Sequence, residues 1–325
     1  MKTPRLVASL ICALTLTCSA GVLAQTVLKI GFTATNDSHY GTAANVFGEE
    51  LAKRTNGRYK LQNFPSSALG GEREMVEAVQ LGSQDMVITS TGPVGNFVPD
   101  TRVFDIPFLF RDYEHARKVL DGPIGQEVLT RFPGKGLVAL SWLENGFRHL
   151  TNNKQPITGP ENLRGMKIRT MENKVHMEAF KTLGALPTPV AMNELFTSLQ
   201  QGTVDGQENP IPVILSNKLY TVQKHLTLDG HVYSPALLLI SPTVWAKVSE
   251  ADRKAFQEAA RLALAANRKR VNEDEAKGIA IIRNAGVSVV EKVDLTRFQT
   301  AVAPAYAVYA KEFGADRIKK IQDVK

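Results

Sequence analysis

Three polar segments in the middle of the chain carry residue types that bind carboxylates. They are Gly146-Phe147-Arg148, Leu163 to Arg169, and Leu199 to Pro210. Arginine presents a planar fork that donates two parallel hydrogen bonds to a carboxylate, a geometry that lysine cannot copy. Arg169 ends a predicted short strand, and ligand crevices of α/β folds lie at the carboxyl ends of strands. A surface arginine at 169 and a turn residue at Asn209, before Pro210, are the alternatives.

The sequence lacks the local motifs of common enzyme classes. It contains no glycine-rich phosphate loop, no G-x-G-x-x-G, no G-x-S-x-G elbow and no H-E-x-x-H pair. Its six histidines lie at least six residues apart, so no local pair could bind a metal ion. These absences favour a binding protein without cofactor or metal. A catalytic site assembled from distant residues stays an alternative.

The first 24 residues have the pattern of a secretory signal peptide. Lys2 and Arg5 precede a short apolar run from Val7 to Leu16, and small or apolar residues precede Gln25. The run is shorter than the ~20 residues that a membrane span needs. An uncleaved anchor and a lipid attachment at Cys18 are the alternatives. Both cysteines of the chain, Cys12 and Cys18, lie in this leader, so a mature chain would have no disulfide, which suits a bacterial periplasm.

Length, composition and charge indicate a globular binding protein. The chain has 325 residues, of which 43% are hydrophobic and 22% charged, a size that predicts about two domains. Loss of Lys2 and Arg5, in a leader without acids, lowers the formal charge from +7 to +5. The densest basic cluster, Arg268-Lys269-Arg270, is followed by three acidic residues at 273–275 and reads as a solvated helix face. We therefore expect no nucleic-acid partner.

Hydrophobic periodicity predicts two α/β units. Residues 27–90 alternate as strand, helix, strand, helix, strand, which is typical of a parallel sheet covered by helices. A second α/β unit occupies about 148–230, after strand segments at 136–143 and 147–151. A helical pattern that starts at Ser249 continues to about Asn284, long enough to span both units. We expect one lobe at 25–147 plus about 232–260, and the other at 148–231 plus part of 261–325, with the bridging helix at about 249–284.

Five ordered motifs resemble those of a transport family. They are Ser67 to Glu74, Ile106 to Phe110, Gly146-Phe147-Arg148, Leu163 to Arg169, and Leu199 to Pro210. Over nearly all of the chain after the leader, the sequence resembles the DctP family, the extracytoplasmic solute-binding subunits of tripartite ATP-independent periplasmic (TRAP) transporters. The resemblance implies an α/β fold of the two-lobed periplasmic binding protein type (class II-like), with parallel or mixed sheets flanked by helices. It also implies that the lobes close on an organic acid.

The same resemblance implies roles for three residues. Arg169 matches the arginine that holds the substrate carboxylate with both arms of its fork. Arg148 matches a second cationic contact, and Asn209 matches an amide that hydrogen-bonds the ligand.

Further candidates follow from their positions alone. Glu72, at a helix N-terminus, could accept hydrogen bonds from substrate hydroxyls or simply cap its helix. His39 follows the first strand and could reach the cleft, or cap a helix or lie on the surface. Asn96 could reach the cleft from a loop. Phe196 and Tyr233 could wall the pocket, although their spacing also suits core packing.

These observations predict a periplasmic, monomeric solute-binding protein, not an enzyme. It would capture a small organic acid by an arginine–carboxylate clamp and deliver it to the membrane subunits of a TRAP transporter. C4-dicarboxylates, sugar acids such as uronates, and branched hydroxy acids stay open as ligands. The alternatives are a periplasmic enzyme that acts on acidic small molecules and a sensor or scavenger without a membrane partner.

Overall fold

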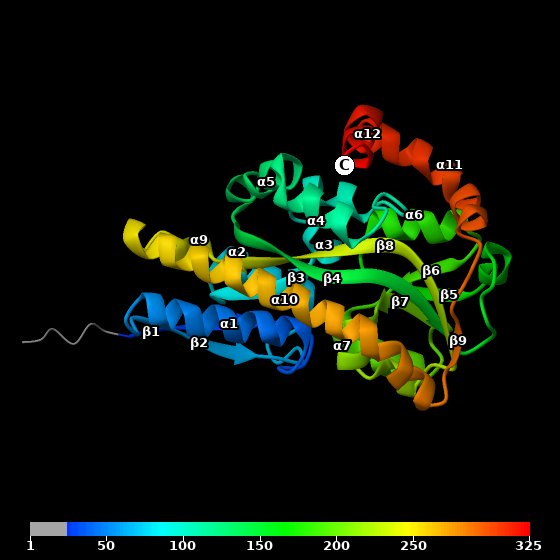
Figure 1. Cartoon of the computed structure of the whole chain (residues 1–325), viewed down its shortest axis with the longest axis horizontal. Coiled ribbons are helices and arrows are strands. Elements are labelled where there is room, and N and C mark those ends of the chain that lie inside the picture. The colour runs from blue at the N-terminus through cyan, green and yellow to red at the C-terminus, as the bar shows by residue number, and fades with distance from the viewer. Residues whose placement is uncertain (1–24) are drawn as a thin grey trace, which may run out of the picture.

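The computed structural model describes residues 25–325 (Figure 1). Within this range nine strands form one sheet in the order β2-β1-β3-β8-β4-β7-β5-β6, with β9 paired to β8. The predicted leader at 1–24, with Cys12 and Cys18, lies outside the described residues. The strands are β1 (Thr26–Gly31), β2 (Tyr59–Phe64), β3 (Met86–Ser90), β4 (Val138–Asn152), β5 (Lys167–Thr170), β6 (Leu186–Pro189), β7 (Gly206–Pro210), β8 (His225–Ile240) and β9 (Ser288–Val290).

Helices flank the sheet and confirm the predicted α/β class (Figure 1). The α-helices are α1 (His39–Arg54), α2 (Glu72–Leu81), α3 (Thr91–Val94), α4 (Tyr113–Asp121), α5 (Pro123–Leu129), α6 (Lys174–Thr182), α7 (Met192–Gln200), α8 (Ile211–Ser216), α9 (Pro242–Trp245), α10 (Glu250–Asn284), α11 (Leu295–Phe313) and α12 (Ala315–Gln322). Short 3-10 helices are η1 (Pro99–Asp105), η2 (Pro133–Lys135), η3 (Pro160–Leu163) and η4 (Leu219–Thr221). No helix among residues 25–325 combines the length and the apolar character that a bilayer crossing requires.

Two groups of parallel strands are joined by two long antiparallel strands. β1 pairs in parallel with β2 and β3, and β5 pairs in parallel with β6 and β7. We call β1–β3 with α1–α5 the first unit, and β5–β7 with α6–α8 the second unit. β4 and β8 pair with each other, while β8 also borders β3 and β4 also borders β7. The chain therefore passes between the units within a continuous sheet, and the residue limits predicted for the lobes stay a prediction.

β4 is a single strand where the sequence predicted two segments separated at Gly146. Its pairing with β8 shifts register between Glu144 and Gly146, a β-bulge. Gly146 has a φ of 120°, a conformation that L side chains rarely adopt. The bulge bends and twists the strand without ending it, so β4 serves both units.

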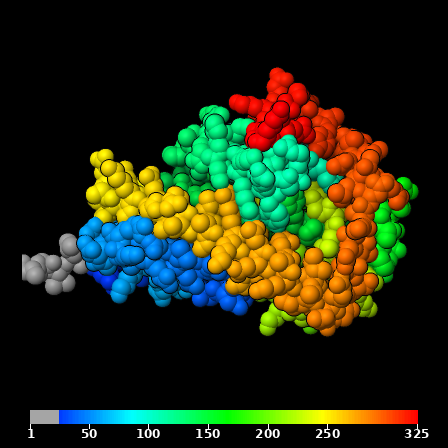
Figure 2. All heavy atoms as spheres, in the orientation of Figure 1, coloured from blue at the N-terminus to red at the C-terminus, as the bar shows by residue number. Residues whose placement is uncertain are grey.

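The long helix α10 contacts both units, as its length predicted. It begins where expected, since the Ser249 side chain accepts a hydrogen bond from Asp252 N at 3.1 Å. Its first half packs Phe256 and a row of buried alanines against α1, and the two helices lie side by side in Figure 2. Farther along, a Cβ on Gly278 would come within 2.3 Å of Ile211 Cγ2 in α8. This glycine therefore permits the close approach of α10 to the second unit.

The C-terminal helices also connect the two units. In α11, Tyr309 Oη donates to Val175 O of α6 at 2.8 Å. The end of α12 lies beside α4, where His115 Nε2 is 2.9 Å from Ile321 O (Figure 1). Together with β4, β8 and α10, these helices tie the units through several crossings rather than one tether.

A buried network of charged side chains joins the strands β4, β7 and β8. Arg148 of β4 is fully buried, with its Nε paired to Glu208 Oε2 and its Nη2 donating to Glu208 Oε1 at 2.8 Å. His231 Nε2 lies 3.2 Å from the same carboxylate, and His231 Nδ1 lies 2.8 Å from Asp229 Oδ2. Opposite charges alternate through this network, which offsets the cost of removing each from water.

The network shifts two pKa values in opposite directions. Burial alone would raise the pKa of Glu208, but the charge of Arg148 and the hydrogen bond with His231 hold it well below its usual value. Burial would lower the pKa of His231, but Asp229 and Glu208 raise it to about 9. Both groups are therefore charged at neutral pH.

This network predicts that stability falls in alkaline solution. The folded-state pKa of His231 lies above its ordinary value of 6.5, so its stabilisation is full below pH 6.5 and is lost as pH rises through about 9. Between pH 7 and pH 10 we expect the free energy of unfolding to lose on the order of 2–3 kcal/mol from this residue. Urea denaturation of the wild type and of His231→Gln over this range measures the difference in slope.

His225→Gln is the matched control, because the pKa of His225 is lowered by burial and its ring is neutral throughout that range. Its slope should equal that of the wild type. Equal slopes for the wild type and His231→Gln would mean that His231 is not a buried cation.

Candidate functional site

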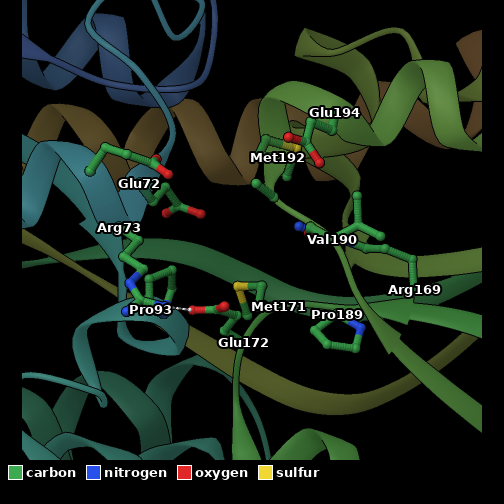
Figure 3. A pocket seen from close by; sticks show the side chains of 12 residues that line it. Glu72, Arg73, Pro93, Arg169, Met171, Glu172, Pro189, Val190, Met192 and Glu194 are labelled. Atoms are coloured by element: carbon green, nitrogen blue, oxygen red, sulfur yellow. Dashed lines mark hydrogen bonds and ion pairs between the residues drawn. The ribbon is translucent and has the colours of Figure 1, made fainter.

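A cavity of about 230 Å³ lies between the first and second units (Figure 3). On one side Glu72, Arg73 and Pro93 come from α2 and α3 (Figure 3). On the other side Arg169 comes from β5, Val190 from the segment before α7, and Met192 from the start of α7. We call it the outer cavity. Its complete lining is Glu72, Arg73, Glu74, Pro93, Arg169, Met171, Glu172, Pro189, Val190, Ala191, Met192 and Glu194.

A smaller inner cavity adjoins the outer one, since both are lined by Glu72, Met171 and Met192. Its volume of about 10 Å³ is room for one oxygen-sized group. Its lining is mostly polar: Thr33, Ala34, Tyr40, Glu72, Ser90, Asn145, Met171, Met192, Asn209, Val213 and Asn217. The two cavities together therefore form a larger chamber, lined by charged and apolar side chains, with a narrow end lined mostly by polar residues.

Arg169 brings an unpaired positive charge to the outer cavity. Strand β5 ends at Thr170, so the side chain lies at the carboxyl end of a strand, as the sequence predicted. The residue is 1% exposed; its Nε donates to Val190 O at 2.8 Å, and Nη1 has no partner among residues 25–325. Burial lowers its pKa to about 10, so the guanidinium is still a cation at neutral pH. Such a group is suited to bind an anion.

Arg148 and Asn209 are linked to each other, but they differ in their access to the cavities. Arg148 lines neither cavity and is engaged by Glu208. Its Nη2 also donates to Asn209 Oδ1 at 3.0 Å, and Asn209 lines the inner cavity. The structure thus shows Arg148 orienting Asn209; a direct contact of Arg148 with ligand stays a prediction.

Glu72 lines both cavities, and one of its two carboxylate oxygens already accepts hydrogen bonds from the protein. Its Oε1 accepts hydrogen bonds from Thr89 Oγ1 at 3.0 Å and from Ser90 N and Ser90 Oγ at 2.9 Å each. Its Oε2 has no donor among residues 25–325. The side chain does not cap its own helix, because Gly71 is the N-cap of α2. Glu72 therefore offers one free acceptor oxygen to the site.

His39 and Asn96 lie near the site but line neither cavity. His39 is fully buried, with Nε2 2.9 Å from Oδ1 of Asn145, which does line the inner cavity. Burial lowers the pKa of His39 to about 4, so the ring is neutral. Asn96 is exposed, and its Nδ2 donates to the backbone oxygen of Glu172 across the two units at 3.0 Å. Their roles as ligand contacts stay predictions.

The two aromatic candidates belong to the hydrophobic core. Phe196 packs with the cluster around α7 and α8. Tyr233 is buried in the cluster around α4, and its Oη donates to Glu144 Oε2 at 2.9 Å. Both residues therefore pack in the hydrophobic core, which was the alternative to a place in the pocket wall.

Sequence reasoning missed several lining residues. Ser90 could have been found, because it ends a buried strand at the edge where ligands bind. Tyr40 could not, since it belongs to the apolar stripe of α1 and gave no signal distinct from core packing. Met171 and Met192 follow no motif. Arg73 forms an exposed ion pair with Glu172 at 2.9 Å, which crosses between the units at the cavity's edge (Figure 3).

The arrangement can bind an acid but shows no assembled metal centre. Among residues 25–325, no group of three histidine, cysteine or acidic side chains could hold a metal ion. The buried charges that line the cavities are the Arg169 cation and the Glu72 carboxylate, accompanied by neutral donors and acceptors. The exposed charges at the outer cavity are Arg73, Glu74, Glu172 and Glu194. This combination suits reversible capture of a small anion.

Comparisons with known proteins agree with this chemistry. A solute-binding protein of Verminephrobacter eiseniae is 54% identical over 303 residues, which cover 93% of this chain and 90% of the relative. A TRAP periplasmic solute-binding protein of Polaromonas sp. JS666, solved with D-erythronate, is 65% identical with a TM-score of 0.92, covering 93% of this chain and 99% of that one. The corresponding protein from Bordetella bronchispeptica, with density assigned to pantoate, is 49% identical with a TM-score of 0.91, covering 93% and 100%.

These neighbours confirm the predicted two-lobed fold class. Residues 30–312 match the family described as bacterial extracellular solute-binding protein, family 7 (DctP). The match covers most of the chain and agrees with the similar solute-binding protein and TRAP solute-binding proteins described above. The chain therefore belongs to the DctP family of TRAP periplasmic solute-binding proteins.

Proposed function

We propose that this protein captures a small organic acid in the periplasm, holds its carboxylate on Arg169, and delivers it to the membrane subunits of a TRAP transporter. The observation that carries the proposal is the buried, unpaired guanidinium of Arg169 at a cavity between two units. A ligand carboxylate would supply the missing counter-charge and accept two parallel hydrogen bonds. The leader at 1–24 would direct export and be cleaved before Gln25.

Ligands of the structural neighbours narrow the choice of acid. D-erythronate and pantoate, recorded for two of these neighbours, are both small hydroxylated monocarboxylates. We propose an acid of this kind for the present chain. Because the family consists of solute-binding proteins for transport, the acid would be released unchanged.

Closure of the two units around the acid would complete the site. Arg169 belongs to the second unit and Glu72 to the first, so a ligand that contacts both favours the state in which they are close. The rim pair Arg73–Glu172 and the bond from Asn96 to Glu172 would form in that state. The continuous strands β4 and β8 would supply the hinge.

A thermal-shift screen tests the function directly. At 100 times its dissociation constant a ligand adds roughly 2.7 kcal/mol to stability, so D-erythronate or pantoate should raise the Tm by several degrees. Recovery of the unaltered acid after incubation would exclude turnover. Absence of a shift with every hydroxy acid, uronate and dicarboxylate of the panel would refute the proposal. Uptake of labelled acid by cells should require both this protein and the membrane subunits.

Arg169→Lys should bind the best acid of the screen about ten- to a hundredfold more weakly. Lysine keeps the charge but loses the fork, and a charge-assisted hydrogen bond is worth about 1.5–3 kcal/mol. The Tm without ligand should stay near that of the wild type. Calorimetric titration checks the affinity.

Arg164→Lys is the matched control, because Arg164 is exposed and precedes the same strand. Its affinity should be unchanged. Binding by Arg169→Lys within threefold of the wild type would contradict the clamp, and an early melt without ligand would make Arg169 structural.

A further inference from the structure

The narrow inner cavity carries chemistry that the carboxylate clamp does not explain. Tyr40 is 3% exposed and lines this cavity, yet its Oη has no hydrogen-bond partner among the residues that the structure describes. A buried hydroxyl without a partner is costly, so such groups point to a ligand or to ordered water. Tyr40 lies in the first unit, opposite the second unit that carries Arg169.

Glu72 provides the complementary group at the same place. Its Oε1 is saturated by Thr89 and Ser90, whereas its Oε2 accepts no hydrogen bond from residues 25–325. Burial, with the nearby charge of Glu72, raises the pKa of the Tyr40 phenol well above its usual value, so the phenol keeps its proton. The lining of the inner cavity thus includes one donor and one acceptor that have no partner among residues 25–325.

We infer that Tyr40 and Glu72 form a hydroxyl-reading subsite that selects hydroxylated monocarboxylates over dicarboxylates and over acids without hydroxyls. A hydroxyl can accept from Tyr40 Oη and donate to Glu72 Oε2 at once, and the cavity of about 10 Å³ admits a group of that size. This inference rests on the proposed function, because the same acid must place its carboxylate on Arg169.

Charge at the site argues against a second carboxylate. A carboxylate in the inner cavity would face Glu72 and could donate no hydrogen bond to it. Among residues 25–325, the other two arginines near the site already have anionic partners. Arg148 is paired with Glu208, and Arg73 is paired with Glu172 at the exposed rim. An acid that lacks hydroxyls would instead leave Tyr40 Oη and Glu72 Oε2 without partners. A site whose buried polar groups stay unpaired binds such an acid much more weakly.

Titration calorimetry with three four-carbon acids tests the inference: D-erythronate, butyrate and succinate. The wild type should bind erythronate at least a hundredfold more tightly than either of the others. Tyr40→Phe should weaken erythronate binding about tenfold and change butyrate binding less than threefold. Glu72→Gln should reduce the preference for erythronate over succinate at least tenfold, because it removes the repelling charge.

Tyr59→Phe, a tyrosine of β2 outside both cavities, is the control and should leave all three affinities unchanged. Equal losses for erythronate and butyrate in Tyr40→Phe, or no loss, would overturn the inference. Erythronate binding that is lost with Arg169→Lys but insensitive to Tyr40→Phe would overturn the subsite and leave the proposed function standing. Failure of the wild type to bind these three acids and every other acid of the thermal-shift panel would overturn both.

Discussion

The buried pair between Arg148 and Glu208 is the interaction on which the site depends. Two opposite charges without solvent access must find each other, because either one alone would carry a large desolvation cost. The pair joins β4 to β7, and Arg148 Nη2 also donates to Asn209, which lines the inner cavity. With Arg148 satisfied inside the protein, Arg169 is left as the lining arginine without an anionic partner among residues 25–325.

Because Arg148 is paired and Arg169 is not, the two ends of the combined cavity differ in charge. One end carries a desolvated cation whose electrostatic field is screened little by water. The other end carries Tyr40, Ser90 and Glu72, whose carboxylate is held by the end of β3. An acid with a charged head and a hydroxylated tail matches this gradient, and the ligands seen in two relatives have this form.

The sheet makes such a site compatible with movement. Polar contacts come from both units, yet the connections β4, β8 and α10 are regular elements whose backbone hydrogen bonds lie within the sheet or within the helix. The direct contacts across the rim, Arg73 with Glu172 and Asn96 with Glu172, are few and solvent-exposed. Exposed pairs of this kind are worth little, so the rim itself adds little to the cost of opening. One buried hydrogen bond, from Asn173 Nδ2 to Asp105 Oδ2 at 2.7 Å, also joins the two units.

The sequence by itself determined the alternating elements of the first unit, the long helix and the place of Arg169 at the end of a strand. Helical periodicity and the Ser249 cap predicted α10 to within a residue, and the strand before Arg169 placed that side chain at the ligand edge, because these signals are local. The tertiary structure alone decided the rest. Arg148 meets Glu208 through the pairing of β4 with β7, His39 is hidden behind Asn145, and Tyr40 lines the inner cavity from an apolar stripe. Each of these depends on contacts between residues distant in the chain, which no local pattern encodes.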